Sequence, residues 1–305
     1  MTAMSKAGNL EIMQTCGIQV PNGFTLGAEH YHPAVKPLLR SIEAAIEKST
    51  PVEQVFRSLI IPDETKEYIE NQLLKLSGAR RFAVRSSGNV VQSGEIVPED
   101  GVDVALAGQF DSFLNVPAEL VPEAVLKCWA SLFNERSISS FAIDHDYIHL
   151  SGMSVVIQEM IPAKASAVMM TCDPSGNGET GAIEFTWGPC EAIVAGIVNP
   201  DEAIFNRQGS AIRSTRIGSK VLGIEYADFS SACENANRIR ITEDLRSRLA
   251  LSMIEIGDLI ALGRRVEEIF GCPQDIEAVV TYEGRVVITQ ARPITTLPKN
   301  CSSFS

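Results

Sequence analysis

The sequence has no apolar stretch long enough to cross a bilayer. None of its apolar runs reaches the roughly 18–20 residues that a transmembrane helix needs. Its N-terminus, MTAMSKAGNLEIM, also lacks the basic start and apolar block of a secretory signal. A membrane-spanning or secreted protein is therefore not expected, and we predict a cytoplasmic location.

Positive charge is also scarce. The 305 residues include 26 Lys and Arg against 38 Asp and Glu, which gives a formal net charge of −12. This balance argues against nucleic acid or an anionic membrane as the main partner. An anionic ligand would have to bind where Lys and Arg are placed locally against the overall field.

Cysteine pairs with metal-ligand spacing are absent. The seven cysteines are odd in number, and no two are spaced as C-x-x-C. Neither a disulfide framework nor a zinc site is indicated, and a reducing compartment fits best. Asp144, His145, Asp146 and His149 are ligand types at close spacing, but solvated loop residues are the commoner explanation.

The composition present is that of a soluble globular protein, with 45% hydrophobic and 21% charged residues. Strand-like and helix-like segments interleave, which predicts an α+β (α/β) class with mixed β-sheets and flanking helices. The length allows two packed lobes. We expect an N-terminal lobe of residues 1–160, a C-terminal lobe of residues 161–298, and a flexible tail of residues 299–305.

Apolar periodicity predicts two long helices. The first covers about residues 117–141, and the second covers about residues 243–270 with Thr242 as its N-cap. Between them, Met153–Ile161 reads as a buried strand that could join the two lobes.

The strongest functional pattern lies near the C-terminus, in a predicted β-hairpin. Residues 276–281 and 285–290 are rich in β-branched types, and Glu283-Gly284 between them is a hairpin-turn signal. A loop formed by these two residues would place Tyr282 opposite Arg285. Every other pair of facing residues follows from that one.

This pairing puts Glu277 opposite Gln290 and Asp275 opposite Arg292. Because side chains of a strand alternate with a period of two, all four project from the same face. The other face would carry apolar residues that can pack against a core: Ile276, Ala278, Val280, Val287 and Ala291.

Two carboxylates, an amide and a guanidinium on one face suit a divalent cation bound to a polyphosphate. Oxygens of Asp275, Glu277 and Gln290 would hold Mg²⁺, and Arg292 would neutralise phosphate oxygens. A surface ladder of cross-strand ion pairs explains the same residues. On this segment alone both interpretations stay open.

Two cations further upstream could also meet a phosphate. Lys6 precedes a helix-like run, although an ordinary solvated lysine is the simpler interpretation. Arg85 ends an apolar strand before two serines and a glycine, where backbone N–H groups and a guanidinium can meet a phosphate. Pairing of Arg85 with a local carboxylate is an equal alternative.

Two further positions carry weaker signals. Gly108 could allow close backbone approach to a ligand, or it could form a β-bulge. Gln158 ends a buried strand, where backbone groups could hydrogen-bond an adenine edge.

Nine segments together resemble one known family. In chain order they are SKAGNL with GIQVPNGF, FAVRSS, AGQFDSFLNV, KCWASLF, VVIQEMI, TCDP, WGPCEAIVAG with NPDEAIF, QDIEAVV, and ITQARPIT. The set resembles the nucleotide-binding domain of phosphoenolpyruvate synthase and pyruvate, phosphate dikinase, which rifampin phosphotransferase shares. That resemblance implies an ATP-grasp-like two-lobed fold that binds ATP and Mg²⁺ between its lobes.

The resemblance also implies roles at the matching positions. It implies catalytic roles for Lys6, Arg85, Glu277 and Arg292. It implies contacts with ATP for Lys6, Arg85, Gly108, Ser112, Gln158, Glu277, Gln290 and Arg292. It implies that Mg²⁺ is held by Asp275, Glu277 and Gln290.

The chain departs from the family at several points. Met4-Ser5 stand where two glycines are usual, and Pro189-Cys190 stand where a glycine and a leucine are usual. No segment resembles the family's phosphohistidine or pyruvate-binding domain, so we expect a stand-alone ATP-dependent phosphotransferase. Its acceptor would be a small molecule or a histidine on a separate carrier protein. The alternatives are an ATP-grasp carboxylate–amine ligase and a non-catalytic nucleotide-binding subunit.

Overall fold

A computed structural model describes residues 5–76, 78–92, 95–98, 109–140, 145–175, 178–226, 236–294 and 297. Within these ranges the chain forms two compact units. Unit 1 comprises residues 5–7 and 22–160, and unit 2 comprises residues 8–21, 161–226 and those from 236 onward. Helix α1 (Lys6–Thr15) begins with the last two residues of the first part of unit 1 and continues in unit 2.

Residues 8–21 belong to unit 2, although the sequence placed them in the N-terminal lobe. The side-chain amide of Asn9 donates to the carbonyl of Ala291 at 3.0 Å. The N–H of Ile288 donates to the carbonyl of Gln19 at 2.9 Å. Contacts with the C-terminal hairpin, rather than proximity in sequence, thus decide where this segment packs.

Unit 1 is built on a five-stranded sheet. The strand order is β1-β5-β2-β3, and β4 also pairs with β2. The strands are β1 (Gly23–Leu26), β2 (Arg81–Gln92), β3 (Glu95–Pro98), β4 (Ser112–Pro117) and β5 (Gly152–Glu159). The helices are α2 (Ala28–Val35), α3 (Leu39–Glu47), α4 (Glu53–Phe56), α5 (Asp63–Lys75), α6 (Val121–Ala130), α7 (Glu135–Ser140) and α8 (His145–Leu150).

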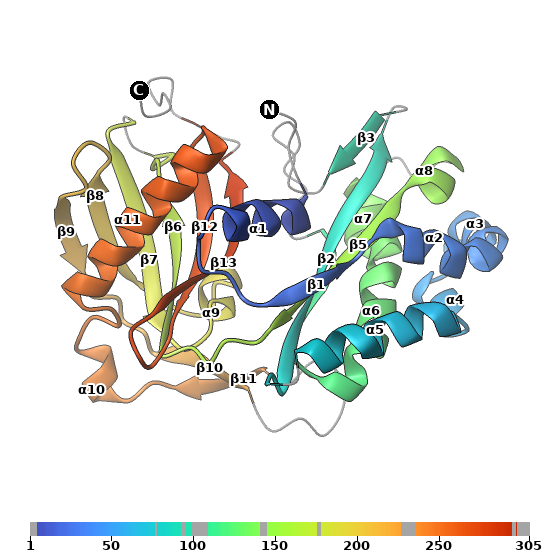
Figure 1. Cartoon of the computed structure of the whole chain (residues 1–305), viewed down its shortest axis with the longest axis horizontal. Coiled ribbons are helices and arrows are strands. Elements are labelled where there is room, and N and C mark those ends of the chain that lie inside the picture. Colours follow the sequence, from blue (N-terminus) through green and yellow to red (C-terminus); the bar gives the residue numbers. More distant parts are fainter. Residues whose placement is uncertain are drawn as a thin grey trace. The chain divides into compact units, whose positions relative to one another are not determined.

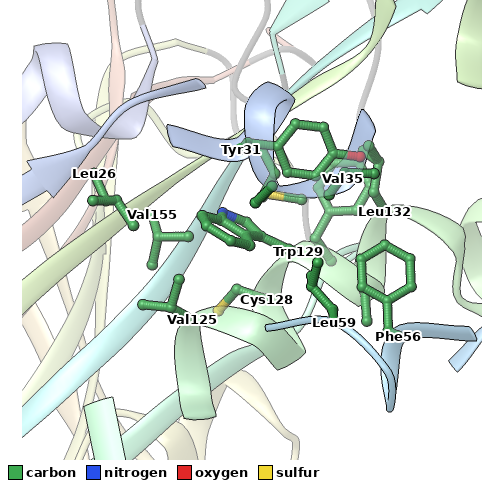
Figure 2. Packing of buried hydrophobic residues seen from close by; sticks show 14 of the residues in the cluster. Leu26, Tyr31, Val35, Phe56, Leu59, Val125, Cys128, Trp129, Leu132 and Val155 are labelled. Atoms are coloured by element: carbon green, nitrogen blue, oxygen red, sulfur yellow. The ribbon is translucent and has the colours of Figure 1, made fainter. Parts of the chain in front are cut away.

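The core of unit 1 lies between these helices and one face of the sheet. Figure 2 shows Trp129 of α6 surrounded by aliphatic and aromatic side chains from several elements. The rings of Tyr31 and Trp129 meet edge to face, with centroids 5.9 Å apart. Alternate residues of β2, among them Phe82 and Val84, are buried in this cluster, as the period of a strand requires.

The helix predicted over residues 117–141 is interrupted. Single 3-10 turns at Ala118–Leu120 and Ser131–Phe133 flank α6. Asn134 has extended backbone, with φ −70° and ψ 168°. Its side-chain oxygen accepts from the N–H of Ser137 at 2.8 Å and so caps α7. A capping residue therefore ends one helix and starts the next, while the apolar periodicity continues through the break.

Unit 2 contains a six-stranded sheet in the order β13-β12-β6-β7-β8-β9 and a separate β10-β11 ribbon. Helix α11 (Met253–Phe270) lies across one face of the larger sheet (Figure 1). The strands are β6 (Ala165–Met170), β7 (Thr180–Trp187), β8 (Asp201–Asn206), β9 (Ile212–Arg216), β10 (Leu222–Tyr226), β11 (Ala236–Arg240), β12 (Gln274–Val280) and β13 (Val286–Pro293). The shorter helices are α9 (Glu191–Val194) and α10 (Glu243–Arg246).

The helix predicted over residues 243–270 is in fact two helices, α10 and α11. Thr242 forms no side-chain cap hydrogen bond, whereas Ser252 and Glu255 form a reciprocal capping box at the start of α11. Gly271, with φ +67°, ends α11 in the left-handed conformation. The Ser-x-x-Glu spacing is a start signal that the periodicity argument overlooked.

A buried ion pair joins three segments of unit 2. Asp201 and Lys220 form a salt bridge with both side chains at 0% exposure. The carboxylate of Asp201 also accepts from the backbone N–H groups of Gly218 and Ala250, each at 2.8 Å. The start of β8, the approach to β10 and the approach to α11 thus meet at one carboxylate.

The α+β class is confirmed, with one difference in the sheets. All strand pairings among the described residues are antiparallel, whereas mixed sheets were expected. Neighbours such as β8 and β9 follow each other through a connection too short for a parallel crossover, which needs about a dozen residues.

Cysteine chemistry also differs from expectation. Cys172 takes part in a disulfide bond, which the sequence did not predict. Cys16, Cys128, Cys190 and Cys272 remain thiols.

Among the described helices, none is both long and apolar enough to cross a bilayer. The cytoplasmic location stays a prediction.

The capping box of α11 gives a testable stability prediction. Burial alone would raise the pKa of Glu255, but hydrogen bonds from Lys164 and Ser252 outweigh burial and lower that pKa. Glu255→Gln should therefore reduce the free energy of unfolding at pH 7 by about 1 kcal/mol, the usual value of a helix cap. Urea unfolding of the variant and the parent protein measures this difference.

The same variant has an expected pH dependence. The folded-state pKa of Glu255 lies below its unfolded value of about 4.3, so its stabilisation is fully present above that pH. It is lost as the pH falls through the lower, folded-state pKa. The difference between variant and parent should shrink below about pH 4, and a difference unchanged at pH 3 would contradict the assignment. Glu268→Gln, on the exposed side of α11, is the control.

Candidate functional site

Three of the residues predicted to bind nucleotide share one face of the sheet in unit 1. Arg85 of β2 lies opposite Ser112 of β4 on one side and opposite Val156 of β5 on the other. Gln158 lies two residues beyond Val156, opposite Ala83. Because alternate residues share a face, Arg85, Ser112 and Gln158 all project away from the apolar core.

These three side chains differ in exposure. Ser112 is exposed, Arg85 is half-buried and Gln158 is buried, with 3% of its surface exposed. Beside Gln158, Gly23 of β1 approaches β5 so closely that a Cβ atom would lie 2.3 Å from the carbonyl oxygen of Ile157. The close approach of the two backbones therefore requires glycine at this position.

Lys6 lies next to the same strand. Its ammonium nitrogen donates to the carbonyl of Ser86 at 2.9 Å, and only 6% of the residue is exposed. The interpretation of Lys6 as an ordinary solvated lysine is therefore wrong. Because Ser86 follows Arg85 in β2, the ammonium group of Lys6 meets the backbone of β2 at the residue next to Arg85.

Two expectations fall on residues outside the described ranges. Gly108 lies there, so its role in nucleotide binding stays a prediction. The tail of residues 299–305, which the sequence predicted to be flexible, lies there as well.

In unit 2, the predicted pairing of the C-terminal hairpin is confirmed at all four polar positions. Asp275 lies opposite Arg292, and Glu277 lies opposite Gln290. Nε and Nη2 of Arg292 both donate to Oδ2 of Asp275, at 3.0 and 2.7 Å. The cross-strand ion pair of the simpler interpretation is thus present at one of the two pairs.

The pairing is reached in a way that the sequence did not predict. The N–H of Thr281 donates to the carbonyl of Arg285 at 2.9 Å, so the loop has three residues, 282–284, rather than two. Gly284 takes the left-handed conformation with φ +80°, as the last residue of such a loop does. The longer loop shifts the register by one residue.

A β-bulge then shifts the register back. Ala278 lies opposite Ile288, whereas its neighbour Glu277 lies opposite Gln290, so Thr289 is the extra residue. The hydroxyl of Thr289 donates to the carbonyl of Glu277 at 3.2 Å. Loop and bulge compensate each other, and the polar side chains therefore meet as predicted.

The predicted face of Val287 is wrong because of the same shift in register. It was expected on the apolar face with Ile276, but it lies opposite Val279, on the side of the sheet that carries Glu277. Both valines are buried, at 4% and 7% exposure. The polar face is therefore confined to the end of the hairpin beyond the bulge.

The four polar side chains are sheltered to different degrees. Gln290 is buried at 6% exposure, and Glu277 is half-buried. The side chains of Asp275 and Arg292 are 15% and 30% exposed. Partial burial strengthens their electrostatic interactions relative to charges in open water.

The sequence did not single out one acidic residue on the same face. Glu277 lies opposite Val168 of β6, and Val168 lies opposite Glu184 of β7. Glu184 is exposed within an otherwise largely buried strand, which is the signal that could have identified it. It lies opposite Glu202, which is bonded to Arg216 at 2.9 Å.

Among the described residues, no group of three or more His, Cys, Asp or Glu side chains could hold a metal ion. His149, one of the closely spaced ligand types in the sequence, belongs to no such group. Its Nε2 lies 2.8 Å from Oε1 of Glu43. The metal set predicted for the hairpin contains only two such residues, with an amide as the third ligand.

Comparison with known proteins identifies a family match over almost the whole chain. Residues 4–303 match the model of the pyruvate phosphate dikinase, AMP/ATP-binding domain. A probable phosphoenolpyruvate synthase of Methanothermobacter thermautotrophicus is 31% identical over 97% of this chain and 44% of its own length. A rifampicin phosphotransferase of a Streptomyces species is 31% identical over 94% of this chain and 33% of its own length. The chain thus spans less than half of either relative.

Two of the solved structures that match this chain have a distant likeness to it. A D-alanine–D-alanine ligase from Coxiella burnetii is 10% identical over 96% of this chain and 49% of that chain, with a TM-score of 0.38. A biotin carboxylase from Campylobacter jejuni is 9% identical over 96% of this chain and 40% of that chain, with a TM-score of 0.37. At these scores the similarity favours no particular activity.

The left-handed conformation of Gly284 in the hairpin loop can be tested by two matched glycine substitutions. Gly284→Ala should lower the free energy of unfolding by about 1–2 kcal/mol, because an L-residue is strained in the left-handed region. A Cβ atom at Gly284 would have room, since its nearest atom lies 4.0 Å away. Chemical unfolding of the variant measures the cost.

Gly257→Ala is the control, and its effect should have the opposite sign. Gly257 lies in α11 with nothing within 4 Å of an added Cβ atom, so alanine should stabilise the helix by up to about 1 kcal/mol. Equal effects of the two substitutions would contradict the left-handed conformation of Gly284.

Proposed function

Because this chain belongs to the pyruvate phosphate dikinase AMP/ATP-binding domain family, we propose that it binds ATP with Mg²⁺ and transfers a phosphoryl group from it. One observation carries the proposal. The hairpin β12-β13 presents Asp275, Glu277, Gln290 and Arg292 together on one face, in a chain that matches the family over residues 4–303.

The donor set of this face fits Mg²⁺. Asp275 and Glu277 offer carboxylate oxygens from one strand, and Gln290 offers an amide oxygen from the next. Mg²⁺ prefers oxygen ligands, and it usually takes one or two protein carboxylates together with phosphate oxygens and water. When bound, the ion would neutralise charge on the phosphate oxygens of ATP.

Arg292 would serve both the metal ligands and the phosphates. Its two hydrogen bonds reach one oxygen of Asp275 and so fix the orientation of that carboxylate. The guanidinium remains 30% exposed and supplies positive charge at the face where phosphate oxygens would lie. Hydrogen bonds between a guanidinium and phosphate are charge-assisted and about twice as strong as neutral ones.

Unit 1 would supply the remaining contacts with the nucleotide. Lys6, which donates to the carbonyl of Ser86, and Arg85, which precedes Ser86 in β2, would contact its phosphates. Ser112 and Gln158, on the same face as Arg85, would line the pocket and the adenine end, and Gly108 would line the pocket as well. Catalysis would rest on positioning and charge neutralisation.

The acceptor is proposed to be a small molecule or a histidine on a separate carrier protein. The names of the two relatives support phosphoryl transfer, one as a phosphoenolpyruvate synthase and the other as a rifampicin phosphotransferase. This chain covers 44% and 33% of those proteins, so their substrates are starting points for a screen.

Labelled ATP tests the proposal. The protein is incubated with ATP labelled at the β- or the γ-phosphate, alone and with cell lysate, and products are separated into small molecules and protein. Label on a small molecule supports a small-molecule acceptor, and label on a protein supports a carrier histidine. Formation of an amide with release of ADP would instead support a carboxylate–amine ligase. Mg²⁺-dependent ATP binding without any turnover would support a non-catalytic subunit.

Glu277→Gln tests the metal face directly. It keeps the shape of the side chain but removes a charge that holds Mg²⁺, so turnover should fall about 100-fold or more. The Mg²⁺ concentration needed for half-maximal ATP binding should rise. Titration calorimetry with ATP at several Mg²⁺ concentrations, together with the turnover assay, measures both effects.

Glu268→Gln makes the same chemical change at an exposed position of α11 and should alter neither quantity. Full turnover and unchanged Mg²⁺ dependence in Glu277→Gln would remove Glu277 from the metal site.

A further inference from the structure

The strand that carries Gln290 and Arg292 is an edge strand. Within the part of the chain that the structure describes, β13 pairs only with β12 in the larger sheet of unit 2. Its outer edge is contacted instead by α1 and the chain that follows it. The buried side chain of Asn9, at 3% exposure, donates through Nδ2 to the carbonyl of Ala291 at 3.0 Å.

Ala291 stands between the two candidate site residues of β13. Its carbonyl points to Asn9 and therefore away from β12. In an antiparallel ladder, successive residues direct their backbone groups alternately to the partner strand and away from it. The backbones of Gln290 and Arg292 therefore face β12, in the pairing that sets them opposite Glu277 and Asp275.

This pairing depends on the bulge at Thr289. If the ladder continued from Ala278 and Ile288 without a bulge, Gln290 would lie opposite Ile276. Its side chain would then point to the face that packs on α11, where Ile276 and Met169 approach Gly263. A shift of one residue thus removes Gln290 and Arg292 from the candidate site.

Two contacts hold β13 on either side of this bulge. Before the bulge, the N–H of Ile288 donates to the carbonyl of Gln19 at 2.9 Å. After the bulge, the carbonyl of Ala291 accepts from Asn9. Of the two, only the second depends on a side chain, so it is the one that the sequence controls.

We propose that Asn9 is a positioning residue, which holds β13 in the bulged register and so keeps Gln290 and Arg292 on the face of Asp275 and Glu277. The functional meaning of that face rests on the proposed binding of Mg²⁺ and ATP. The structural part of the inference, control of the register by Asn9, stands on the hydrogen bond and the bulge alone.

Asn9→Asp is the variant that tests this role. It keeps the size of the side chain but replaces the donating amide with a carboxylate, which cannot donate when ionised. Amide hydrogen exchange in residues 286–293 should become about tenfold faster or more, as expected when a buried carbonyl loses its hydrogen bond. The Mg²⁺ concentration for half-maximal ATP binding should rise by a similar factor, with ATP affinity at saturating Mg²⁺ changed much less.

Asn71→Asp is the matched control, because Asn71 is an exposed residue of α5. It should change neither exchange in β13 nor Mg²⁺ dependence. Asn9→Ser, which retains a shorter donor, should restore part of both properties. A residue that only supported the fold would not separate Mg²⁺ dependence from ATP affinity in this way.

The outcomes distinguish failure of this inference from failure of the proposed function. Unchanged exchange in β13 of Asn9→Asp would overturn the positioning role, whatever the protein binds. Absence of Mg²⁺-dependent ATP binding in the parent protein would overturn the proposed function, while the exchange result would still decide the role of Asn9. If Asn9→Asp does not fold, the neutral Asn9→Ala replaces it. Failure of both to fold would show a global structural role and overturn the local one.

Discussion

The register between β12 and β13 is the constraint on which the candidate site depends. Side chains of a strand alternate between its two faces, so a shift of one residue would exchange the polar and apolar faces of β13. One face packs on α11 through residues such as Ile276, and the other carries Glu277 and Asp275. On the face that packs against α11, Arg292 would be buried without Asp275 as its partner. Burying an unpaired charge costs free energy, and this cost favours the observed register.

The hairpin also shows what sequence reasoning can and cannot determine. The opposition of Asp275 to Arg292 followed from a turn signal and simple alternation, and it is confirmed. The two-residue loop and the unbroken ladder behind that prediction are both wrong, and their errors cancel. Gly284 is compatible with either loop, and a bulge at Thr289 has no clear local signal, because it is settled by packing of the two strands. Val287 shows the consequence, since it lies between loop and bulge and faces the opposite side.

Other differences arise where distant contacts decide the structure. Lys6 is buried because it reaches the carbonyl of Ser86, 80 residues away in sequence, and no local pattern reveals such a contact. The breaks at Asn134 and Ser252 have a different cause. Both residues are good helix caps and were visible in the sequence, but apolar periodicity continued past them and was given more weight. Cap residues inside a periodic segment are therefore informative about where one helix ends and another begins.

The buried pair of Asp201 and Lys220 has a consequence for how this protein can change over time. Each charge is fully enclosed and is compensated mainly by the other, so replacing either one alone would leave an isolated charge in the interior. Replacing both with apolar residues of similar volume could be nearly neutral, apart from the two backbone N–H groups that Asp201 satisfies. Substitutions at Asp201 and Lys220 should therefore occur together or not at all. Random mutagenesis with selection for folded protein should recover changes at these positions chiefly as double substitutions.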